Sequence, residues 1–416
     1  MFEGAFQKFY RQLVLDAFSR GKYGEFRMMM PGGACRLFGG LGKELEAKIT
    51  IKDGNFYRRC VFYGALGFAE SYLHQEWETD DLTHVIAWCF LNREVFSTVA
   101  TQKHQRRKID FLKSLTQWKY HLRVNNKKKS REQVQDPYHL GSDFFKAWLG
   151  PSMTYSAAHY NSAKQTLEEA QEEKWEQLCQ KLRLRSHDYL LDAGCGWGEF
   201  AIYAAKKYQC RVQAVTISEE QFREAALRVE QAGVADLVEV SFCDYRDLSG
   251  RFDKIVAIEM LQHVGDRCVE TFFSKMEELL APRGLMVIQT PLCGDNEYPL
   301  RRDSVDFVQN HIEPGSQVMS LRRMTEALNV TSDLHLLEAE DRTFSAAQTY
   351  RVWRKNLIEA LPSLKKQGYD PLFLRKWFYY LCYKEAAFAT RYLAMTQLFY
   401  TRPNNYLELN SPLYSL

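Results

Sequence analysis

The stretch Leu190-Leu191-Asp192-Ala193-Gly194-Cys195-Gly196-Trp197-Gly198 decides the fold, because an apolar run and an acid lead into three glycines at alternate positions. The apolar run predicts a buried strand, and the glycines predict a tight loop after it. A Cβ in that loop would block left-handed backbone angles and the close approach of a ligand to the backbone NH groups. The GxGxG spacing differs from the GxGxxG of dinucleotide-binding folds and lacks the Lys-Ser/Thr ending of a phosphate loop. Turn geometry alone also explains such glycines, so the flanking elements have to decide.

Strands and helices alternate on the C-terminal side of this loop. Helices are expected at 200–208 and from Glu219 onward. Four further strands are expected at 212–218, 238–245, 252–258 and 284–290, the last after a turn at 281–284. This alternation predicts an α/β fold with a mostly parallel sheet, whose ligands bind beyond the carboxyl ends of the strands. The glycine loop, 216–221 and 244–245 are therefore expected at one edge of the sheet.

Several long motifs narrow the family. In order they are YHLGSDFF at 138–145, LGPSMTYS at 149–156, LEEAQ at 167–171, DAGCGWG at 192–198, VTISEEQ at 215–221, DYRDL at 244–248 and HVG at 263–265. Together they resemble the cyclopropane fatty acid synthases and mycolic acid cyclopropane synthases, from about residue 138 to residue 353. The resemblance implies a Rossmann-like class I methyltransferase domain that uses S-adenosyl-L-methionine.

A smaller N-terminal accessory domain is expected to precede the catalytic domain. We predict an accessory domain at 1–115 that helps to engage lipid, a basic linker at 116–137 and the catalytic domain at 138–416. Within the first domain the sequence predicts helices at 6–19 and 62–73 and strands at 24–30 and 47–51.

Composition excludes several classes of function. The 416 residues carry a net charge of +3, which is too small to indicate nucleic acid as a partner. No stretch approaches the roughly 18 apolar residues that cross a bilayer, so we expect a cytoplasmic protein. The ten cysteines form no CxxC pair, and no metal site is predicted.

Two basic runs, at 103–108 and 125–131, surround the predicted domain junction. They are interpreted either as solvated linkers or as sites of attraction to anionic lipid headgroups, where each basic residue contributes about 1 kcal/mol. An enzyme that modifies membrane lipid without a transmembrane segment needs such a contact. Peripheral association with a membrane surface is therefore expected.

The resemblance also assigns the residues that bind S-adenosylmethionine. Tyr155 and Ser156 contact the methionine part, Gly194 and Gly196 approach the cofactor with their backbone, Thr216, Ile217 and Gln221 lie near the ribose, and Asp244 and Tyr245 adjoin the adenine. A glutamine amide oxygen at Gln221 can accept a hydrogen bond from a ribose hydroxyl, as a carboxylate would.

The base of the reaction is where this sequence departs from the family. By resemblance, four side chains of the relatives hold a bicarbonate ion that takes up the final proton, and the corresponding positions here are Ala157, Gln262, Gln289 and Ala346. Two alanines offer no side-chain donor, and neutral glutamines supply neither a carboxylate nor an imidazole. The sequence therefore indicates that bicarbonate binding has been lost.

A replacement base has to come from elsewhere in the site. The predicted catalytic set consists of Gln262, Gln289 and three candidate bases, which are His159, His263 and Tyr350. A packing role is the alternative interpretation for both histidines. If the segment around Ala346 is helical, Tyr350 lies about one turn away from it and replaces the missing hydroxyl.

The predicted function is S-adenosylmethionine-dependent C-methylation of the double bond in unsaturated fatty acyl chains of phospholipids. Whether the product is a cyclopropane or a methyl-branched chain stays open, as does a homodimer. Two other interpretations remain. One is an N-methyltransferase acting on a small amine, and the other is a non-catalytic lipid- or cofactor-binding partner of an active homologue.

Overall fold

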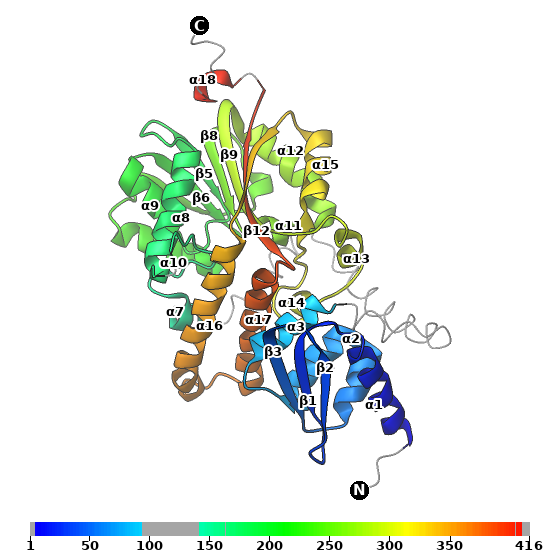
Figure 1. The fold of residues 1–416 in the computed structure, drawn as a ribbon. Coiled ribbons are helices and arrows are strands. Elements are labelled where there is room, and N and C mark those ends of the chain that lie inside the picture. The colour runs from blue at the N-terminus through cyan, green and yellow to red at the C-terminus, as the bar shows by residue number, and fades with distance from the viewer. Residues whose placement is uncertain (1–4, 94–140, 163, 404, 410–416) are drawn as a thin grey trace. The chain divides into compact units, whose positions relative to one another are not determined.

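The computed structural model describes residues 5–93, 141–162, 164–403 and 405–409 (Figure 1). The predicted linker at 116–137 and both basic runs lie outside these residues. The chain forms two compact units. Besides the N-terminal residues, unit 1 contains 303–312 and 361–392, whereas unit 2 contains the remainder of the described chain. Two segments that the sequence analysis assigned to the catalytic domain thus group with the N-terminal residues.

Unit 1 contains a four-stranded sheet in the order β2-β1-β3-β4, in which β1 runs parallel to β3 and antiparallel to β2. Its strands are β1 (Tyr23–Met29), β2 (Cys35–Gly39), β3 (Leu41–Ile51) and β4 (Trp77–Glu78). Its helices are α1 (Ala5–Phe18), α2 (Asn55–Leu73), α3 (Leu82–Leu91), α14 (Phe307–His311) and α17 (Pro371–Ala389). The helices and strands predicted for the N-terminal part are all present. The sequence missed β2, because four of its five residues are exposed and it lacks an apolar alternation.

Helix α17 belongs to unit 1 because it is buried against that unit. Asp370 accepts a hydrogen bond from Phe373 N at 3.0 Å and caps the helix start, where Pro371 costs no hydrogen bond. The rings of Tyr383 on α17 and Phe90 on α3 lie 5.1 Å apart edge to face. A helix late in the sequence therefore completes the core that begins at the N-terminus.

Unit 2 is built on an eight-stranded sheet. The strands are β5 (Tyr189–Ala193), β6 (Arg211–Thr216), β7 (Val238–Phe242), β8 (Phe252–Ile258), β9 (Leu280–Cys293), β10 (Met319–Ser320), β11 (His335–Asp341) and β12 (Ala394–Thr401). Their order is β11-β12-β9-β8-β5-β6-β7, and β10 pairs with β9. All pairs are parallel except those of β12, which runs antiparallel to both of its neighbours. The predicted α/β class and the mostly parallel sheet are confirmed.

Helices cover both faces of this sheet (Figure 1). The helices that begin in unit 2 are α7 (Ser142–Leu149), α8 (Leu167–Lys181), α9 (Glu199–Tyr208), α10 (Glu219–Gln231), α11 (Leu261–Val264), α12 (Val269–Leu279), α13 (Tyr298–Arg302), α15 (Leu321–Thr331), α16 (Thr343–Lys366) and α18 (Tyr406–Leu409), with short 3-10 turns η1 (Tyr245–Asp247) and η2 (Asp266–Cys268). In Figure 1, α8, α9 and α10 lie on one face of the sheet, and α12 and α15 lie on the other. This is the layered arrangement of a doubly wound fold.

One local prediction about the sheet is wrong. The turn expected at 281–284 is part of β9, which starts at Leu280. The pairing of β9 with β8 shifts register there, because Phe252 faces Leu280 while Lys254 faces Leu285. The extra residues form an irregularity that accommodates Pro282, which has no NH to give to the ladder.

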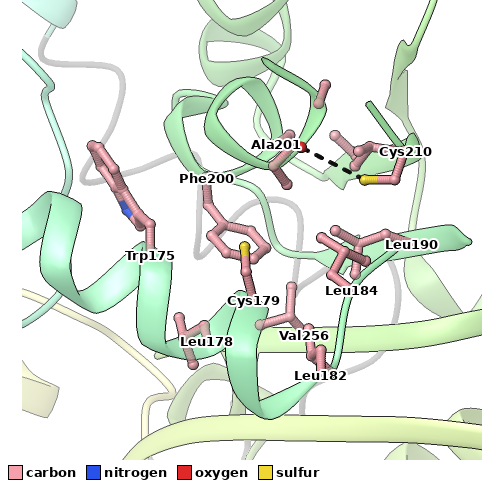
Figure 2. Packing of buried hydrophobic residues seen from close by; sticks show 14 of the residues in the cluster. Trp175, Leu178, Cys179, Leu182, Leu184, Leu190, Phe200, Ala201, Cys210 and Val256 are labelled. Atoms are coloured by element: carbon pink, nitrogen blue, oxygen red, sulfur yellow. Dashed lines mark hydrogen bonds between the residues drawn. The ribbon is translucent and has the colours of Figure 1, made fainter. Parts of the chain in front are cut away.

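A dense apolar core supports the start of the glycine loop. Figure 2 shows Phe200 of α9 and Cys179 of α8 packed beside Leu190 of β5. Cys179 and Leu190 are fully buried, and Phe200 is 4% exposed. Close packing of this kind resists displacement, so the end of β5 is held rigidly. No helix among the described residues combines the length and apolar character needed to cross a bilayer.

Candidate active site

The site lies at the point where the strand order of unit 2 reverses. From β5 the chain proceeds outward through β6 and β7, and it then returns to β8 on the other side of β5. Ligands of open α/β sheets bind at this switch point, beyond the carboxyl ends of the strands. Gly194 directly follows β5 and Glu259 directly follows β8. The two segments touch, because a Cβ built on Gly194 would lie 2.9 Å from Met260 Cγ.

The glycine loop has the backbone conformation that the sequence predicted. Gly194 and Gly196 have φ angles of 91° and 55°, which L side chains rarely adopt. Gly194 N and Cys195 N donate to Val215 O at 3.1 and 2.9 Å, so the loop is fixed to the end of β6. A Cβ built on Gly196 would meet no atom within 4 Å. Open space in front of a left-handed glycine backbone is what a cradle for S-adenosylmethionine requires.

The predicted ribose residues form a local pair next to this loop. Thr216 Oγ1 donates to Gln221 Oε1 at 2.8 Å, and Gln221 N donates to Ser218 Oγ at 3.3 Å, which caps α10. Ile217 lies half-buried between them. Gln221 is therefore held in place by its own neighbours at the start of the helix.

The predicted adenine residues follow β7. Asp244 is 1% exposed, and its carboxylate accepts hydrogen bonds from Arg246 Nε at 2.8 Å and Nη2 at 2.6 Å. Tyr245 is buried against the ring of Phe272, with centroids 5.6 Å apart. Asp244 thus stands at the expected edge of the sheet with its carboxylate held by Arg246.

Ser156 is attached to a buried cation that sequence reasoning missed. Lys174 Nζ donates to Ser156 Oγ at 2.7 Å, and Gln171 Nε2 donates to Ser156 O at 3.0 Å. Lys174 is fully buried on the same face of α8 as Gln171 and Leu178. A lysine within the apolar stripe of a helix is the signal that could have revealed it.

Two carboxylates compensate the charge of Lys174. Burial lowers the pKa of Lys174 to about 7, while the negative charges of Glu259 and then Asp192 act to raise it. Burial likewise raises the pKa of Asp192 to about 7, and the charge of Lys174 opposes that rise. Asp192 Oδ2 is buried without a hydrogen-bond partner among the described residues. Lys174, Glu259 and Asp192 thus form a charge cluster, and Asp192 stands two residues before Gly194, the first glycine of the loop.

Aromatic rings surround Tyr155. Its ring centroid lies 5.7 Å from those of Phe145, Trp148 and Trp353. Phe145 also lies 6.0 Å from Trp197 in the glycine loop, and Tyr350 packs 5.0 Å from Trp353. Tyr350, a candidate base from the sequence, thus belongs to this aromatic cluster, which we define as Phe145, Trp148, Tyr155, Trp197, Tyr350 and Trp353.

Two of the positions that resemble the bicarbonate site, Ala157 and Gln289, are brought together, and a carboxylate contacts both. Gln289 Nε2 donates to Ala157 O and to Glu259 Oε1, both at 3.0 Å. Ala157 N donates to the same Glu259 oxygen at 2.6 Å. Gln397 Nε2 donates to Gln289 Oε1 at 2.9 Å and so fixes the orientation of the Gln289 amide. Sequence reasoning missed Glu259, because nothing in its spacing distinguishes it from a plain strand-end acid.

The other two positions lie on helices, Ala346 on α16 and Gln262 on α11. Ala346 is fully buried on α16, one turn before Thr349, whose hydroxyl accepts a hydrogen bond from Ala158 N at 3.0 Å. The expected helix is thus confirmed, and its Ala346 face lies on the 157–158 segment. Gln262 lies in α11, and its Oε1 is buried without a hydrogen-bond partner among the described residues. His263 follows it and is partly exposed.

His159 lies among other groups. Its Nε2 lies 2.8 Å from Arg342 Nη1, and Gln177 Oε1 accepts from Arg342 Nη2 at 2.9 Å. Burial, followed by the charge of Arg342, lowers the pKa of His159, so the ring is neutral and accepts from Arg342. This contact with Arg342 favours a packing role for His159.

Within the described residues, no group of three or more histidine, cysteine, aspartate or glutamate side chains is placed to hold a metal ion.

The family model described as Mycolic acid cyclopropane synthetase matches residues 125–398. The chain belongs to this family. Tuberculostearic acid methyltransferase of Mycobacterium tuberculosis is 32% identical over 349 residues, which cover 82% of this chain and 79% of that protein. Cyclopropane-fatty-acyl-phospholipid synthase of Escherichia coli is 31% identical over 358 residues, which cover 86% and 88%.

A solved structure of a mycolic acid cyclopropane synthase, CmaA1 complexed with SAH and CTAB, has a TM-score of 0.61 and 25% identity and covers 65% of this chain and 97% of that chain. These likenesses agree with the glycine loop and the strand order. The family member described here is an S-adenosylmethionine-dependent methyltransferase with a class I fold.

Proposed function

We propose that this enzyme methylates the double bond of an unsaturated fatty acyl chain within a phospholipid. The observation that carries the proposal is the likeness, over more than four fifths of the chain, to enzymes named as a tuberculostearic acid methyltransferase and a cyclopropane-fatty-acyl-phospholipid synthase. The predicted loss of bicarbonate binding is part of the proposal, because none of its four positions carries the side chain expected from the resemblance.

The aromatic cluster suits such a substrate. Adding a methyl group to an alkene leaves a positive charge on carbon, and aromatic faces attract a cation while they exclude water. The rings of Tyr155 and Trp353 lie 5.7 Å apart beside the 156–158 segment, next to the network around Glu259. A small polar amine would gain little from so many apolar rings.

The residues of the glycine loop would hold the methyl donor. Bound S-adenosylmethionine supplies an electrophilic methyl group. Gly194 and Gly196 would approach it with their backbone, while Ser156, fixed by Lys174 at 2.7 Å, would contact the methionine part. The protein then has to align the alkene and keep water away, because orientation and dehydration account for much of the barrier.

Unit 1 offers an apolar surface for a membrane, which supports work at a lipid surface. On α1, Phe6 is 77% exposed and Phe9 is 45% exposed, and the two rings are one turn apart. Such exposed rings are costly in water and enter a headgroup region readily. The variant Phe6→Glu/Phe9→Glu is expected to bind vesicles of anionic phospholipid more weakly in a flotation assay, whereas Phe344→Glu, which changes an exposed ring on α16, is the control.

The decisive experiment supplies deuteriomethyl-labelled S-adenosylmethionine and vesicles of dioleoyl phosphatidylethanolamine and dioleoyl phosphatidylglycerol, with and without bicarbonate. Mass spectrometry of the lipid extract should show label in the acyl chain at the same rate in both conditions. A product that keeps all three deuterium atoms is methyl-branched, whereas a product that has lost one is either a cyclopropane or its methylene-branched isomer. Ozonolysis cleaves only the methylene-branched isomer at the modified position and so separates the two.

Absence of label in every lipid would contradict acyl-chain methylation. Labelled small amines under the same conditions would then support the N-methyltransferase interpretation. Cofactor binding without transfer to either acceptor would support a non-catalytic binding partner. A rate that rises with bicarbonate would show that the anion still acts, despite the four substitutions.

A further inference from the structure

We propose that the carboxylate of Glu259 is the catalytic base of this enzyme and replaces the bicarbonate ion of its relatives. The inference rests on the proposed function, because only methylation of an alkene requires a base to remove a proton from carbon. It concerns a residue that the resemblance does not assign to any role.

Glu259 lies at the edge of the sheet where the methyl donor is expected. Glu259 directly follows β8 at the switch point, and its neighbour Met260 abuts Gly194 of the glycine loop. The methyl donor and the end of β8 therefore share one edge of the sheet. A base at this place therefore lies close to the carbon that receives the methyl group.

Two hydrogen bonds hold the carboxylate of Glu259. Oε1 accepts hydrogen bonds from Ala157 N at 2.6 Å and from Gln289 Nε2 at 3.0 Å. By resemblance, positions 157 and 289 are two of the four that contact bicarbonate in the relatives. A carboxylate carried by the protein thus lies against the same two residues that would hold the free anion. Alanine at 157 leaves room, and glutamine at 289 offers an amide NH to the carboxylate.

The backbone of Glu259 has an unfavourable conformation. Its φ angle is 51°, in the left-handed region that is unfavourable for a residue with a Cβ. Its NH donates to Gln289 O at 2.7 Å, so the strained conformation is held by the same partner that binds the side chain. Strained backbone of this kind concentrates at functional sites, where it aims a side chain.

A nearby cation and partial exposure both suit the carboxylate of Glu259 to act as a base. Lys174 lies close enough for the charge of Glu259 to be the largest influence that raises the lysine pKa. That cation favours the ionised carboxylate, which is the form a base requires. Glu259 is also half-buried, whereas Ala157 and Gln289 are each only 1% exposed. Of these three residues, Glu259 is the one that a reactant can reach.

The proton balance is simple. The π electrons of the alkene form the new bond to the methyl carbon, the sulfur–methyl bond of the donor breaks, and SAH leaves with that electron pair. The neighbouring chain carbon then carries the one positive charge. Glu259 then accepts a proton. If the proton leaves the new methyl group, the electrons of that C–H bond close the cyclopropane ring; if it leaves an adjacent chain carbon, they form a new double bond. The product is neutral, and the resulting carboxylic acid returns its proton to water before the next turnover.

The test compares wild type with Glu259→Gln, which keeps an oxygen acceptor for Ala157 N but loses the basic charge. We expect lipid methylation to fall at least about 100-fold, within the range that a general base contributes. Binding of SAH, measured by calorimetry, should stay within about twofold of wild type. Glu326→Gln, which alters a surface carboxylate paired with Arg322 on α15, is the matched control and should retain full activity.

A second variant guards against misfolding. Glu259→Gly keeps a backbone that tolerates the φ angle and empties the space of the side chain. It should be equally inactive, and added bicarbonate or formate should restore part of the activity, whereas the same anions should leave wild type unchanged.

Each contrary outcome is distinct. The assignment of Glu259 as the base would be overturned if Glu259→Gln were as active as wild type. It would also be overturned if the activity of wild type depended on bicarbonate. A loss of SAH binding that matches the loss of turnover would make Glu259 a cofactor-holding residue instead. A wild-type enzyme that labels no lipid would overturn the proposed function, and the base with it.

Discussion

Lys174 Nζ and Ser156 Oγ lie 2.7 Å apart, which ties a fully buried lysine on α8 to the loop that is expected to hold the methionine part of the cofactor. The same lysine is the counter-charge of Asp192 and Glu259. One buried cation therefore connects the core, the glycine loop and the network around Glu259. A buried charge of this kind is costly on its own and is tolerated because it is paired.

Lys174→Met should destabilise the protein strongly, because it leaves two carboxylates without their cation. Leaving a buried charge uncompensated costs about 3–5 kcal/mol. Urea unfolding followed by circular dichroism measures the loss. Lys206→Met on the exposed surface of α9 is the control, and it should change stability by less than about 0.5 kcal/mol. Equal effects of the two variants would contradict the structural importance of the Lys174 cluster.

Gly196→Ala should weaken binding of SAH and should destabilise the protein no more than Gly233→Ala does. Gly196 has φ 55° and Gly233 at the end of α10 has φ 68°, and a Cβ on either would meet nothing within 4 Å. Both substitutions should therefore cost about 1–2 kcal/mol from backbone strain alone. Titration calorimetry should show weaker SAH binding for Gly196→Ala and unchanged binding for Gly233→Ala. Equal binding by both variants would argue against a cradle at Gly196.

At position 259, glycine should give a more stable protein than alanine. The two variants lose the same side-chain contacts, so their difference reports the cost of φ 51° for a residue with a Cβ. We expect Glu259→Gly to exceed Glu259→Ala by about 1 kcal/mol in thermal or urea unfolding. The order should reverse at Glu326 in the middle of α15, where alanine is favoured over glycine by about 1 kcal/mol. The same order at both positions would refute strain at Glu259.

His159 should make the protein sensitive to acid. Its pKa lies below the ordinary value of 6.5, because of burial first and of the charge of Arg342 second. The unfolded chain therefore binds more protons than the folded chain between the lowered pKa and 6.5, and stability falls as the pH falls through that window. A hydrogen bond with Gln177 and then the charges of Glu173 and Glu340 oppose this lowering of the pKa.

The variant His159→Gln keeps an acceptor for Arg342 and does not titrate. Its stability, measured by urea unfolding from pH 7.5 downward, should change less than that of wild type just below pH 6.5. Parallel curves for the two proteins would show that His159 contributes nothing to the pH dependence. Unchanged lipid methylation in this variant would additionally support a packing role for the histidine.

Much of the fold was predictable because it is written in local patterns. The strand at Phe252–Ile258 and the helix at Glu219–Gln231 follow from apolar patterns that act over a few residues. Strand β12 was not predicted, since its place between β9 and β11 depends on pairing with residues more than a hundred positions away. The grouping of 303–312 and 361–392 with the N-terminal residues was missed for the same reason.

The sequence by itself determined the α/β class and the glycine loop from Gly194 to Gly198, because both follow from residue type and order. Its resemblance to the family predicted the departure at Ala157, Gln262, Gln289 and Ala346. Only the tertiary structure decided what occupies that region. Glu259 meets Ala157 and Gln289 across 102 and 30 residues of chain. Such contacts arise when strand ends converge at the edge of a sheet, and spacing along the chain carries no trace of them.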